Sequence, residues 1–293
     1  MKKAVIALGF FDGVHKGHEK IIKTAAQIAR ERSLSCVCLT FATHPQALVS
    51  GKAPEMITTD EEKARLMKKC GAEKVISLPF DEKTAGTPPS EFVRFLKEEL
   101  SCAVAVCGEN FRFGKGAAGK PSDIEKYGVE VFVCGEVAID GKTVSSTLIR
   151  ELVKRGDVER ARVMLGRPFS LSGKVARGRG VGRKLSFPTA NIAPQGGMLI
   201  PKNGVYATVA SVGNKEYAAV TDVGARPTFG GGEVTVESHL PGFSGDLYGK
   251  KMTVRFMERI RDEKRFENAE ELSRQIDKDV SFAREYFSKE DVL

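Results

Sequence analysis

Short apolar runs alternate with helical patterns through the first half of the chain. The apolar runs lie at residues 4–9, 36–41, 74–78 and 103–107. Between them, apolar residues recur with helical spacing over about 16–32, 59–70 and 89–100. Uniformly apolar strands linked by helices are typical of a parallel sheet that is covered on both faces. The pattern predicts a doubly wound α/β domain.

The pattern changes after about residue 168. Four β-branched runs follow, separated by Gly, Asn, Asp and Pro: GVYATVASV, KEYAAVTDV, EVTVESHL and KMTVRFMERI. Runs of this kind predict an antiparallel sheet or a small barrel. From about residue 269 to 287, Leu272, Ile276, Val280 and Ala283 recur with helical spacing, which predicts a closing helix.

The segment RELVKRGDVERARVMLGRPF joins the alternating strand and helix pattern of the first half to the β-rich pattern of the second. It predicts two short helices around a Gly-Asp break, with Asp157 as the N-cap of the second. We place the domain boundary within this segment, which gives domains at residues 1–158 and 159–293.

Composition supports a chain with two cores. The chain has 293 residues, of which 41% are hydrophobic, and this is enough for two ordinary domains. Its six cysteines all lie in the first half and form no CxxC pair, so we expect free thiols and a reducing compartment. No apolar stretch is long enough for a membrane span and no signal-peptide pattern is present, so we expect a cytoplasmic protein.

The net charge of +8 admits two kinds of partner, nucleic acids and polyphosphates. The chain has no tryptophan, no RNA-binding signature and no large basic run, which argues against a nucleic-acid partner. We therefore expect small phosphorylated molecules as ligands, with no nucleic acid and no membrane. The sequence does not indicate an oligomeric state.

The stretch GFFDGVHKGH, residues 9–18, places two histidines between an apolar strand and a helix. His15 and His18 then lie near a helix N-terminus, where backbone N–H groups favour an anion. Both imidazoles can donate to phosphate oxygens, and Gly17 lets the chain approach the phosphates closely. The alternative is structural, with one histidine as a helix cap and the other on the surface.

The stretch FDGVHKGH resembles the HxGH signature of nucleotidylyltransferases, and in particular the bacterial bifunctional riboflavin kinase/FAD synthetase family. Further similar stretches are VSSTLIR (144–150), GENFRFGKGAAG (108–119) and FPTAN (187–191). The resemblance covers residues 5–287. It implies a nucleotidylyltransferase domain with a parallel sheet, followed by a riboflavin kinase domain built on an antiparallel β-barrel.

For the first domain, the resemblance implies that His15 and His18 are catalytic and stabilise the triphosphate of ATP. The residues expected to bind ATP there are Gly9, Phe11, Gly17, Ser146, Thr147 and Arg150, and those expected to bind flavin are Asn110 and Phe111. In the second domain, Arg179, from a basic Gly-rich loop, is expected to bind ATP, and Arg261 is expected to bind flavin.

For the second domain, the resemblance implies that Thr189 and Asn191 hold Mg²⁺ with the nucleotide phosphates. Neutral oxygens suffice for an ion that keeps several waters and shares phosphate oxygens. Glu237, in TVESHLPGF, matches the proposed base that takes the proton of the ribityl hydroxyl. The alternative for Glu237 is a solvent-facing side chain, as is usual for a single glutamate in a strand of alternating pattern.

The implied function is the phosphorylation of riboflavin to FMN with ATP, followed by adenylation of FMN to FAD. The ligands are then riboflavin, ATP, FMN, FAD, pyrophosphate and Mg²⁺. Two departures, Ser186 and Gly242, leave open an alternative in which the kinase module is degenerate and only FMN adenylation remains. A plain cytidylyltransferase would share the two histidines but would leave the β-rich second domain unexplained.

Overall fold

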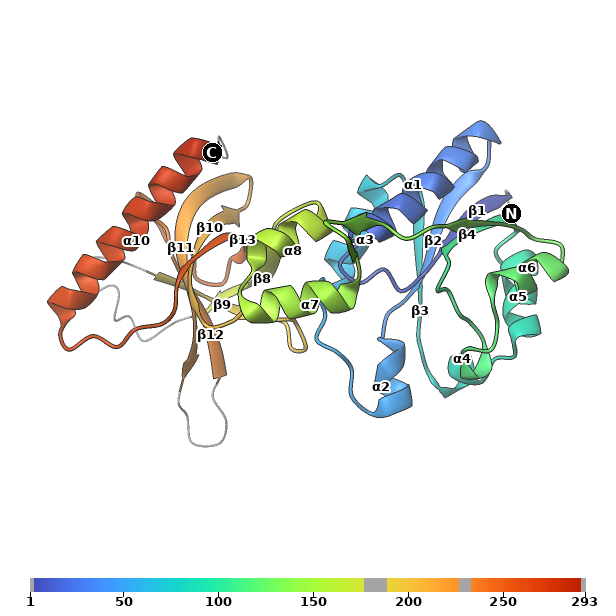
Figure 1. Cartoon of the computed structure of the whole chain (residues 1–293), viewed down its shortest axis with the longest axis horizontal. Coiled ribbons are helices and arrows are strands. Elements are labelled where there is room, and N and C mark those ends of the chain that lie inside the picture. Colours follow the sequence, from blue (N-terminus) through green and yellow to red (C-terminus); the bar gives the residue numbers. More distant parts are fainter. Residues whose placement is uncertain (1–2, 177–188, 227–232, 291–293) are drawn as a thin grey trace. The chain divides into compact units, whose positions relative to one another are not determined.

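The chain forms two compact units, one up to Ser146 and one from Thr147 onward. The structure is a computed structural model that describes residues 3–176, 189–226 and 233–290 (Figure 1). The helices of the joining segment are grouped with the second unit, and the boundary at residues 158 and 159 stays a prediction.

The first unit alternates strands and helices. In chain order its elements are β1 (Ala4–Leu8), α1 (Lys16–Glu31), β2 (Ser35–Phe41), α2 (Pro45–Ser50), α3 (Asp60–Lys69), β3 (Lys74–Leu78), α4 (Glu82–Gly86), α5 (Pro89–Glu98), β4 (Cys102–Gly108), the 3₁₀ turn η1 (Lys115–Ala117), α6 (Pro121–Lys126), β5 (Glu130–Cys134), β6 (Ala138–Ile139) and β7 (Lys142–Thr143). Strands β1 to β5 form one parallel sheet in the order β3-β2-β1-β4-β5.

This sheet has a separate core on each face. Alternate residues of β1 divide between them: Val5 and Ala7 pack with α1 and α3, whereas Ile6 and Leu8 pack with α5 and α6. All five residues of β1 are buried, which explains why the strand is apolar without interruption. The predicted doubly wound architecture is confirmed.

The sheet has a topological switch point at β1. On one side of β1 the chain continues to β2 and β3, and on the other side it continues to β4 and β5. In open α/β sheets, ligands bind beyond the carboxyl ends of the strands at such a switch point. The segments that follow β1, β2 and β4 therefore meet at one edge of the sheet. Two of these segments carry the predicted residues His15, His18 and Asn110.

The second unit begins with two helices and continues as strands. Its elements are α7 (Ser146–Arg155), α8 (Val158–Leu165), β8 (Phe169–Ala176), β9 (Thr189–Pro194), β10 (Gly204–Val212), β11 (Lys215–Arg226), β12 (Glu233–His239), β13 (Lys251–Arg261) and α10 (Ala269–Glu290). Asp157 caps α8 by accepting a hydrogen bond from the Arg160 N–H at 3.2 Å, as predicted. The six strands close into a barrel in the order β10-β11-β12-β9-β8-β13.

Side chains alternate between the inside and the outside of this barrel. Inside, the hydroxyl of Thr221 lies 2.7 Å from that of Thr208 and 2.8 Å from that of Ser238, and all three residues are fully buried. Outside, Val205, Ala207 and Val209 of β10 pack against α10. The closing helix and the barrel predicted from the sequence are both confirmed, and α10 covers part of the outer face (Figure 1).

Most predicted elements match the observed ones within a few residues, but five of the described strands have no counterpart in the prediction. These are the two-residue strands β6 and β7 and the longer strands β5, β8 and β9. In β5, three of the five residues are exposed, and β8 mixes serine, glycine and lysine with its apolar residues, so neither shows a plain apolar run. They are strands because the neighbouring strands pair with them, and the local pattern does not reveal this.

The cysteines are free thiols, as expected. Burial raises the pKa of Cys36 to about 11 and those of Cys102 and Cys107 to about 12, so these thiols stay protonated and unreactive. None of the helices in the described part of the chain has the length and apolar character needed to cross a bilayer.

Gly173 is required where β8 and β9 close the barrel. A Cβ at this position would lie 2.2 Å from the carbonyl oxygen of Ala193. We expect Gly173→Ala to lower the free energy of unfolding of the second unit by about 2 kcal/mol or more, because the backbone of β9 would have to move. Hydrogen exchange of the barrel amides measures this change in the second unit alone.

Gly196→Ala is the matched control, because nothing lies within 4 Å of a Cβ at that position. We expect it to change the same exchange rates little. Equal effects from the two variants would contradict the role assigned to Gly173.

Candidate active sites

The first candidate site lies where β1 passes into α1. His15 is the N-cap of α1, and its Nδ1 accepts a hydrogen bond from the His18 N–H at 3.3 Å. The two imidazole rings stack with their centroids 3.6 Å apart and their planes 18° apart. The prediction left open whether one histidine is a cap; His15 is one, and the stacking holds both rings together at the helix N-terminus.

Gly17 lies between these histidines and leaves room for their stacking. A Cβ at Gly17 would lie 3.2 Å from two ring atoms of His15. Contacts this short would push the His15 ring away from that of His18. The glycine is therefore needed for the geometry of the histidine pair, in addition to any approach by a phosphate.

The turn before the histidines is strained and firmly held. Phe11 has a positive φ of 58°, its ring is buried, and it packs edge-on against His18 at 5.3 Å. A Cβ at Gly9 would lie 2.9 Å from the Phe11 ring, so only glycine fits there. Both residues were predicted to bind ATP, and the structure places the Phe11 ring against that of His18.

Asp12 ties this turn to the segment before α3. Its carboxylate is 1% exposed and accepts hydrogen bonds from the Ile57 N–H at 3.1 Å and the Thr58 N–H at 3.2 Å. The Thr58 hydroxyl also accepts from the Gly13 N–H at 3.1 Å. A buried carboxylate with several donors fixes the backbone around it, which offsets the strain at Phe11. The sequence analysis did not single out Asp12.

Ser146 reaches the same turn from the start of α7. Its hydroxyl donates to the Asp12 carbonyl oxygen at 3.0 Å. Thr147 and Arg150 follow on α7, within the second unit, with Thr147 exposed and Arg150 half-buried. Of the three predicted residues in VSSTLIR, the structure therefore brings Ser146 to the histidine loop.

Asn110 and Phe111 follow the carboxyl end of β4. The Asn110 amide donates to the Glu136 carboxylate at 2.7 Å, on the surface. Phe111 is half-buried and stacks on Phe113, with ring centroids 5.7 Å apart. His44, after β2, caps α2 and packs edge-on against Phe10 at 4.5 Å, which gives it a structural contact.

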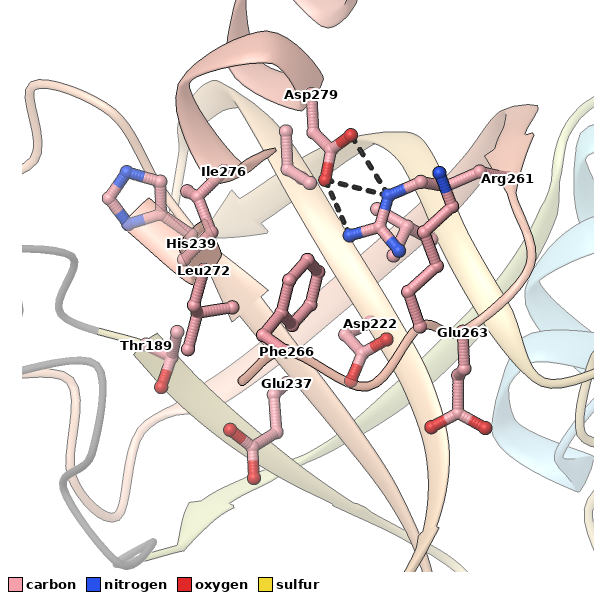
Figure 2. A pocket seen from close by; sticks show the side chains of 13 residues that line it. Thr189, Asp222, Glu237, His239, Arg261, Glu263, Phe266, Leu272, Ile276 and Asp279 are labelled. Carbon is pink, nitrogen blue, oxygen red and sulfur yellow. Dashed lines mark hydrogen bonds and ion pairs between the residues drawn. The ribbon is translucent and has the colours of Figure 1, made fainter. Parts of the chain in front are cut away.

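The second candidate site is a cavity of about 290 Å³ in the second unit, between the outer face of the barrel and α10 (Figure 2). One wall is apolar and comes from Val205, Val220, Phe266, Leu272 and Ile276. The polar residues of the lining are Thr189, Asp222, Glu237, His239, Arg261, Glu263, Lys264 and Asp279. An apolar wall with a few polar groups is typical of a small-molecule site.

Strand register explains how the polar side chains come together. Asn191 of β9 pairs with Glu237 of β12, and Glu237 pairs with Asp222 of β11. Paired residues point to the same face of a sheet with Cβ atoms about 5 Å apart. Thr189, two residues before Asn191, faces the same way. The structure thus brings Thr189, Asn191 and Glu237 together, as the prediction requires, and Glu237 lines a cavity instead of facing open solvent.

Arg261 lines the same cavity, where an ion pair holds its side chain. Its guanidinium binds the carboxylate of Asp279 on α10, with a closest distance of 2.8 Å, and both side chains are largely buried (Figure 2). Gln275 also donates to Asp279, at 2.9 Å. The pair fixes α10 against the end of β13 and so determines the width of the cavity.

Asp222 is one of the polar residues of this cavity that were not predicted from the sequence. Burial, followed by the negative charges of Glu263 and Glu237, raises the pKa of Asp222 to about 6. In the sequence KEYAAVTDV, Asp222 is one polar position in an alternating strand, which gives no sign of a site. The pairing of β11 with β12 places it beside Glu237. Asp279 was also missed, although its position between Ile276 and Val280 on the apolar face of the closing helix is a usable signal.

Two further predictions concern loops. Arg179 and Ser186 lie outside the described residues. Gly242 has a φ of +78°, in a turn where the Phe243 N–H donates to the Leu240 carbonyl at 3.2 Å. A residue with a side chain would be strained there, which gives the glycine a structural reason.

The donor set near β9 suits a hard cation. Thr189 and Asn191 offer neutral oxygens, and Glu237 adds a carboxylate beside them. Within the described ranges, no group of three or more His, Cys, Asp or Glu side chains is arranged to hold a metal ion by itself. The oxygens of β9 therefore suit Mg²⁺ that arrives with nucleotide phosphates.

Comparison with known proteins matches both units. The family model for FAD synthetase matches residues 1–148, and that for riboflavin kinase matches residues 165–287. The bifunctional riboflavin kinase/FMN adenylyltransferase of Bacillus subtilis is 36% identical over 98% of this chain and 93% of its own length. The protein of the same description from Escherichia coli is 34% identical over 97% and 92%.

A solved structure shares the fold over almost the whole chain. It is that of a protein from Streptococcus pneumoniae described as a macrolide-efflux protein, which is 30% identical to this chain. The TM-score is 0.91, with 97% of this chain and 94% of the other covered. The two family models follow one another along the chain in the same order as the α/β unit and the barrel.

The raised pKa of Asp222 predicts how the stability of the barrel depends on pH. The folded state keeps this proton up to about pH 6, whereas an unperturbed Asp loses it near 3.8. Between these pH values the folded state binds more protons than the unfolded state. The contribution of Asp222 to the free energy of unfolding therefore falls as pH rises from about 4 to about 6. We expect Asp222→Asn to be more stable than the wild type above pH 6, by about 1–3 kcal/mol.

Hydrogen exchange of the β11 and β12 amides, corrected for intrinsic rates, measures this difference at several pH values. The two proteins should become equally stable near pH 4. A difference that stays constant across this range would show that ionisation of Asp222 is not its cause.

Proposed function

Because the chain belongs to the bifunctional riboflavin kinase/FMN adenylyltransferase family, and so makes FMN from riboflavin and FAD from FMN, we propose that each domain holds one of the two reactions. Residues 1–158 adenylate FMN, and residues 159–293 phosphorylate riboflavin. The alternative with a degenerate kinase is not supported, since the riboflavin kinase model matches and the relatives are bifunctional by description.

In the kinase reaction, Glu237 is the base. The ribityl hydroxyl of riboflavin gives its proton to Glu237 as its oxygen attacks the γ-phosphorus of ATP. A new O–P bond forms, the bond to the β-phosphate bridging oxygen breaks, and ADP leaves. The observation that carries this assignment is the register that sets Glu237 beside Asn191 at the edge of the cavity.

Thr189 and Asn191 hold the metal–nucleotide complex in this proposal. Mg²⁺, when bound, neutralises charge on the phosphate oxygens. The two side chains orient the γ-phosphate towards the hydroxyl from which Glu237 takes the proton. The closeness of the three residues supports this arrangement, because positioning supplies most of what phosphoryl transfer needs from a protein.

In this proposal the flavin ring packs against the apolar wall of the cavity. Phe266, Leu272 and Ile276 offer a surface suited to a flat aromatic ring system. Arg261 contacts the flavin from the end of β13 and holds α10 in place through Asp279. The ribityl chain then extends toward Glu237.

In the adenylyltransferase reaction, the phosphate of FMN attacks the α-phosphorus of ATP and pyrophosphate leaves. His15 and His18 donate hydrogen bonds to the triphosphate as negative charge builds on it, together with the N-terminal amides of α1. Gly9, Phe11 and Gly17 shape this loop. The stacking of the two rings at a helix N-terminus supports the assignment, since an anion bound there would lie close to both imidazoles.

The remaining ATP contacts in this reaction come from Ser146, Thr147 and Arg150, and Arg179 contacts ATP in the kinase reaction. Asn110 and Phe111 bind the flavin of FMN beyond the end of β4. We further propose that the protein works in the cytoplasm, with riboflavin, ATP, FMN, FAD and pyrophosphate as its ligands and no nucleic acid or membrane as a partner.

Removing one histidine tests the first site. We expect His18→Ala to lower the rate of FAD formation from FMN by about 10²-fold or more, because a positioned donor to the transferring phosphates is lost. FMN formation from riboflavin should persist. Chromatography of both flavins over time measures the two rates in one sample, and an equal loss of both would contradict separate sites.

Neutralising the proposed base tests the second site. We expect Glu237→Gln to lower ADP formation from riboflavin and MgATP by about 10²-fold or more, since the hydroxyl loses its proton acceptor. FAD formation from added FMN should remain, and hydrogen exchange of the barrel amides is the control for folding of the second unit. Near-normal phosphorylation in this variant would remove Glu237 from the mechanism.

A further inference from the structure

Among the described residues, the lining of the cavity in the second unit has more negative than positive side chains. These are four carboxylates, those of Asp222, Glu237, Glu263 and Asp279, and two cations, Arg261 and Lys264. Asp279 pairs with Arg261. The Glu263 carboxylate accepts a hydrogen bond from the Asn203 amide at 3.0 Å and lies toward the exposed rim.

Asp222 and Glu237 form the inner part of this negative surface. They are paired residues on adjacent strands, both are half-buried, and both face the space in front of Phe266 (Figure 2). On its other side, Asp222 pairs with Val205, which brings no charge. A Cβ at Gly224 would lie 2.4 Å from Glu263 Oε1 and 3.6 Å from Asp222 Oδ2, so these two carboxylates are also close.

The reaction proposed for this site changes the charge of the flavin. Riboflavin brings a neutral hydroxyl to Glu237, and that oxygen becomes the ester oxygen of a phosphate with a charge of about −1.5 to −2 at pH 7. The new phosphate must therefore form beside Glu237, about one strand spacing from Asp222. A half-buried carboxylate at that distance repels the product and leaves the neutral substrate unaffected.

We propose that Asp222 is a specificity-determining residue of the kinase site, which weakens the binding of FMN relative to riboflavin and so favours release of the product. The inference rests on the proposed function, in which the flavin occupies this cavity. Glu237 cannot serve this purpose alone, because it receives the substrate's proton during the reaction. Asp222 takes no part in that transfer and keeps its charge at neutral pH.

Competition between the two flavins tests the proposal. ADP is released only by the kinase reaction, so its initial rate of formation reports this site in the full chain, where adenylation releases pyrophosphate instead. We would measure the KM for riboflavin and the competitive inhibition constant of FMN at ATP well below saturation. We expect Asp222→Asn to lower the inhibition constant of FMN about tenfold and to change the KM for riboflavin less than threefold.

Two variants serve as controls. Asp222→Glu keeps the charge and should leave the ratio of the two constants near that of the wild type. Glu216→Gln removes one charge from the far end of the same strand, where Glu216 pairs with Arg255, and should also leave the ratio unchanged. The proposal is overturned if FMN binds no tighter to Asp222→Asn, or if Glu216→Gln gives the same change.

A second measurement needs no variant. Raising the ionic strength from about 0.01 M to about 0.15 M shortens the screening length from about 30 Å to about 8 Å. In the wild type, FMN should then inhibit several-fold more strongly while the KM for riboflavin stays constant. Unchanged inhibition by FMN would overturn the proposal, whereas a wild type that forms no ADP from riboflavin would refute the proposed function itself.

Discussion

The buried ion pair between Arg261 and Asp279 is the interaction on which the second site depends. It joins the end of β13 to α10, and the cavity lies between these two elements. A buried pair recovers its desolvation cost only with good geometry and further hydrogen bonds, and here three contacts from Arg261 and one from Gln275 meet the carboxylate. Without this pair, the apolar face of α10 would still favour packing on the barrel, but the ion pair would no longer fix the position of α10 over the polar row formed by Asn191, Glu237 and Asp222.

The polar row itself follows from the closed barrel. Alternation along each strand sends one set of side chains inward to the hydroxyl cluster of Thr208, Thr221 and Ser238, and the other set outward. The register across β9, β12 and β11 then brings Asn191, Glu237 and Asp222 into one line. Placing three polar residues at the edge of a cavity thus requires no loop of special shape.

Much of the fold was predictable because its signals are local. Strand β1 is apolar throughout since both faces of the sheet are covered, and α10 shows its buried face through Ile276, Val280 and Ala283. The geometry of the histidine pair at a helix N-terminus was predictable because a strand, a glycine turn and a helix start follow one another directly. Asp12 and Asp222 were not, because their roles depend on Thr58 and Glu237, which are distant in the sequence and become neighbours only through pairing.

The capping hydrogen bond of His15 also decides which of its ring nitrogens carries the proton. Nδ1 accepts from a backbone N–H and must offer a lone pair, so in the neutral imidazole the hydrogen resides on Nε2. This tautomer makes Nε2 a donor, the form that an incoming anion requires. The first turn of α1 and the tautomer of His15 are therefore coupled, because one hydrogen bond holds both.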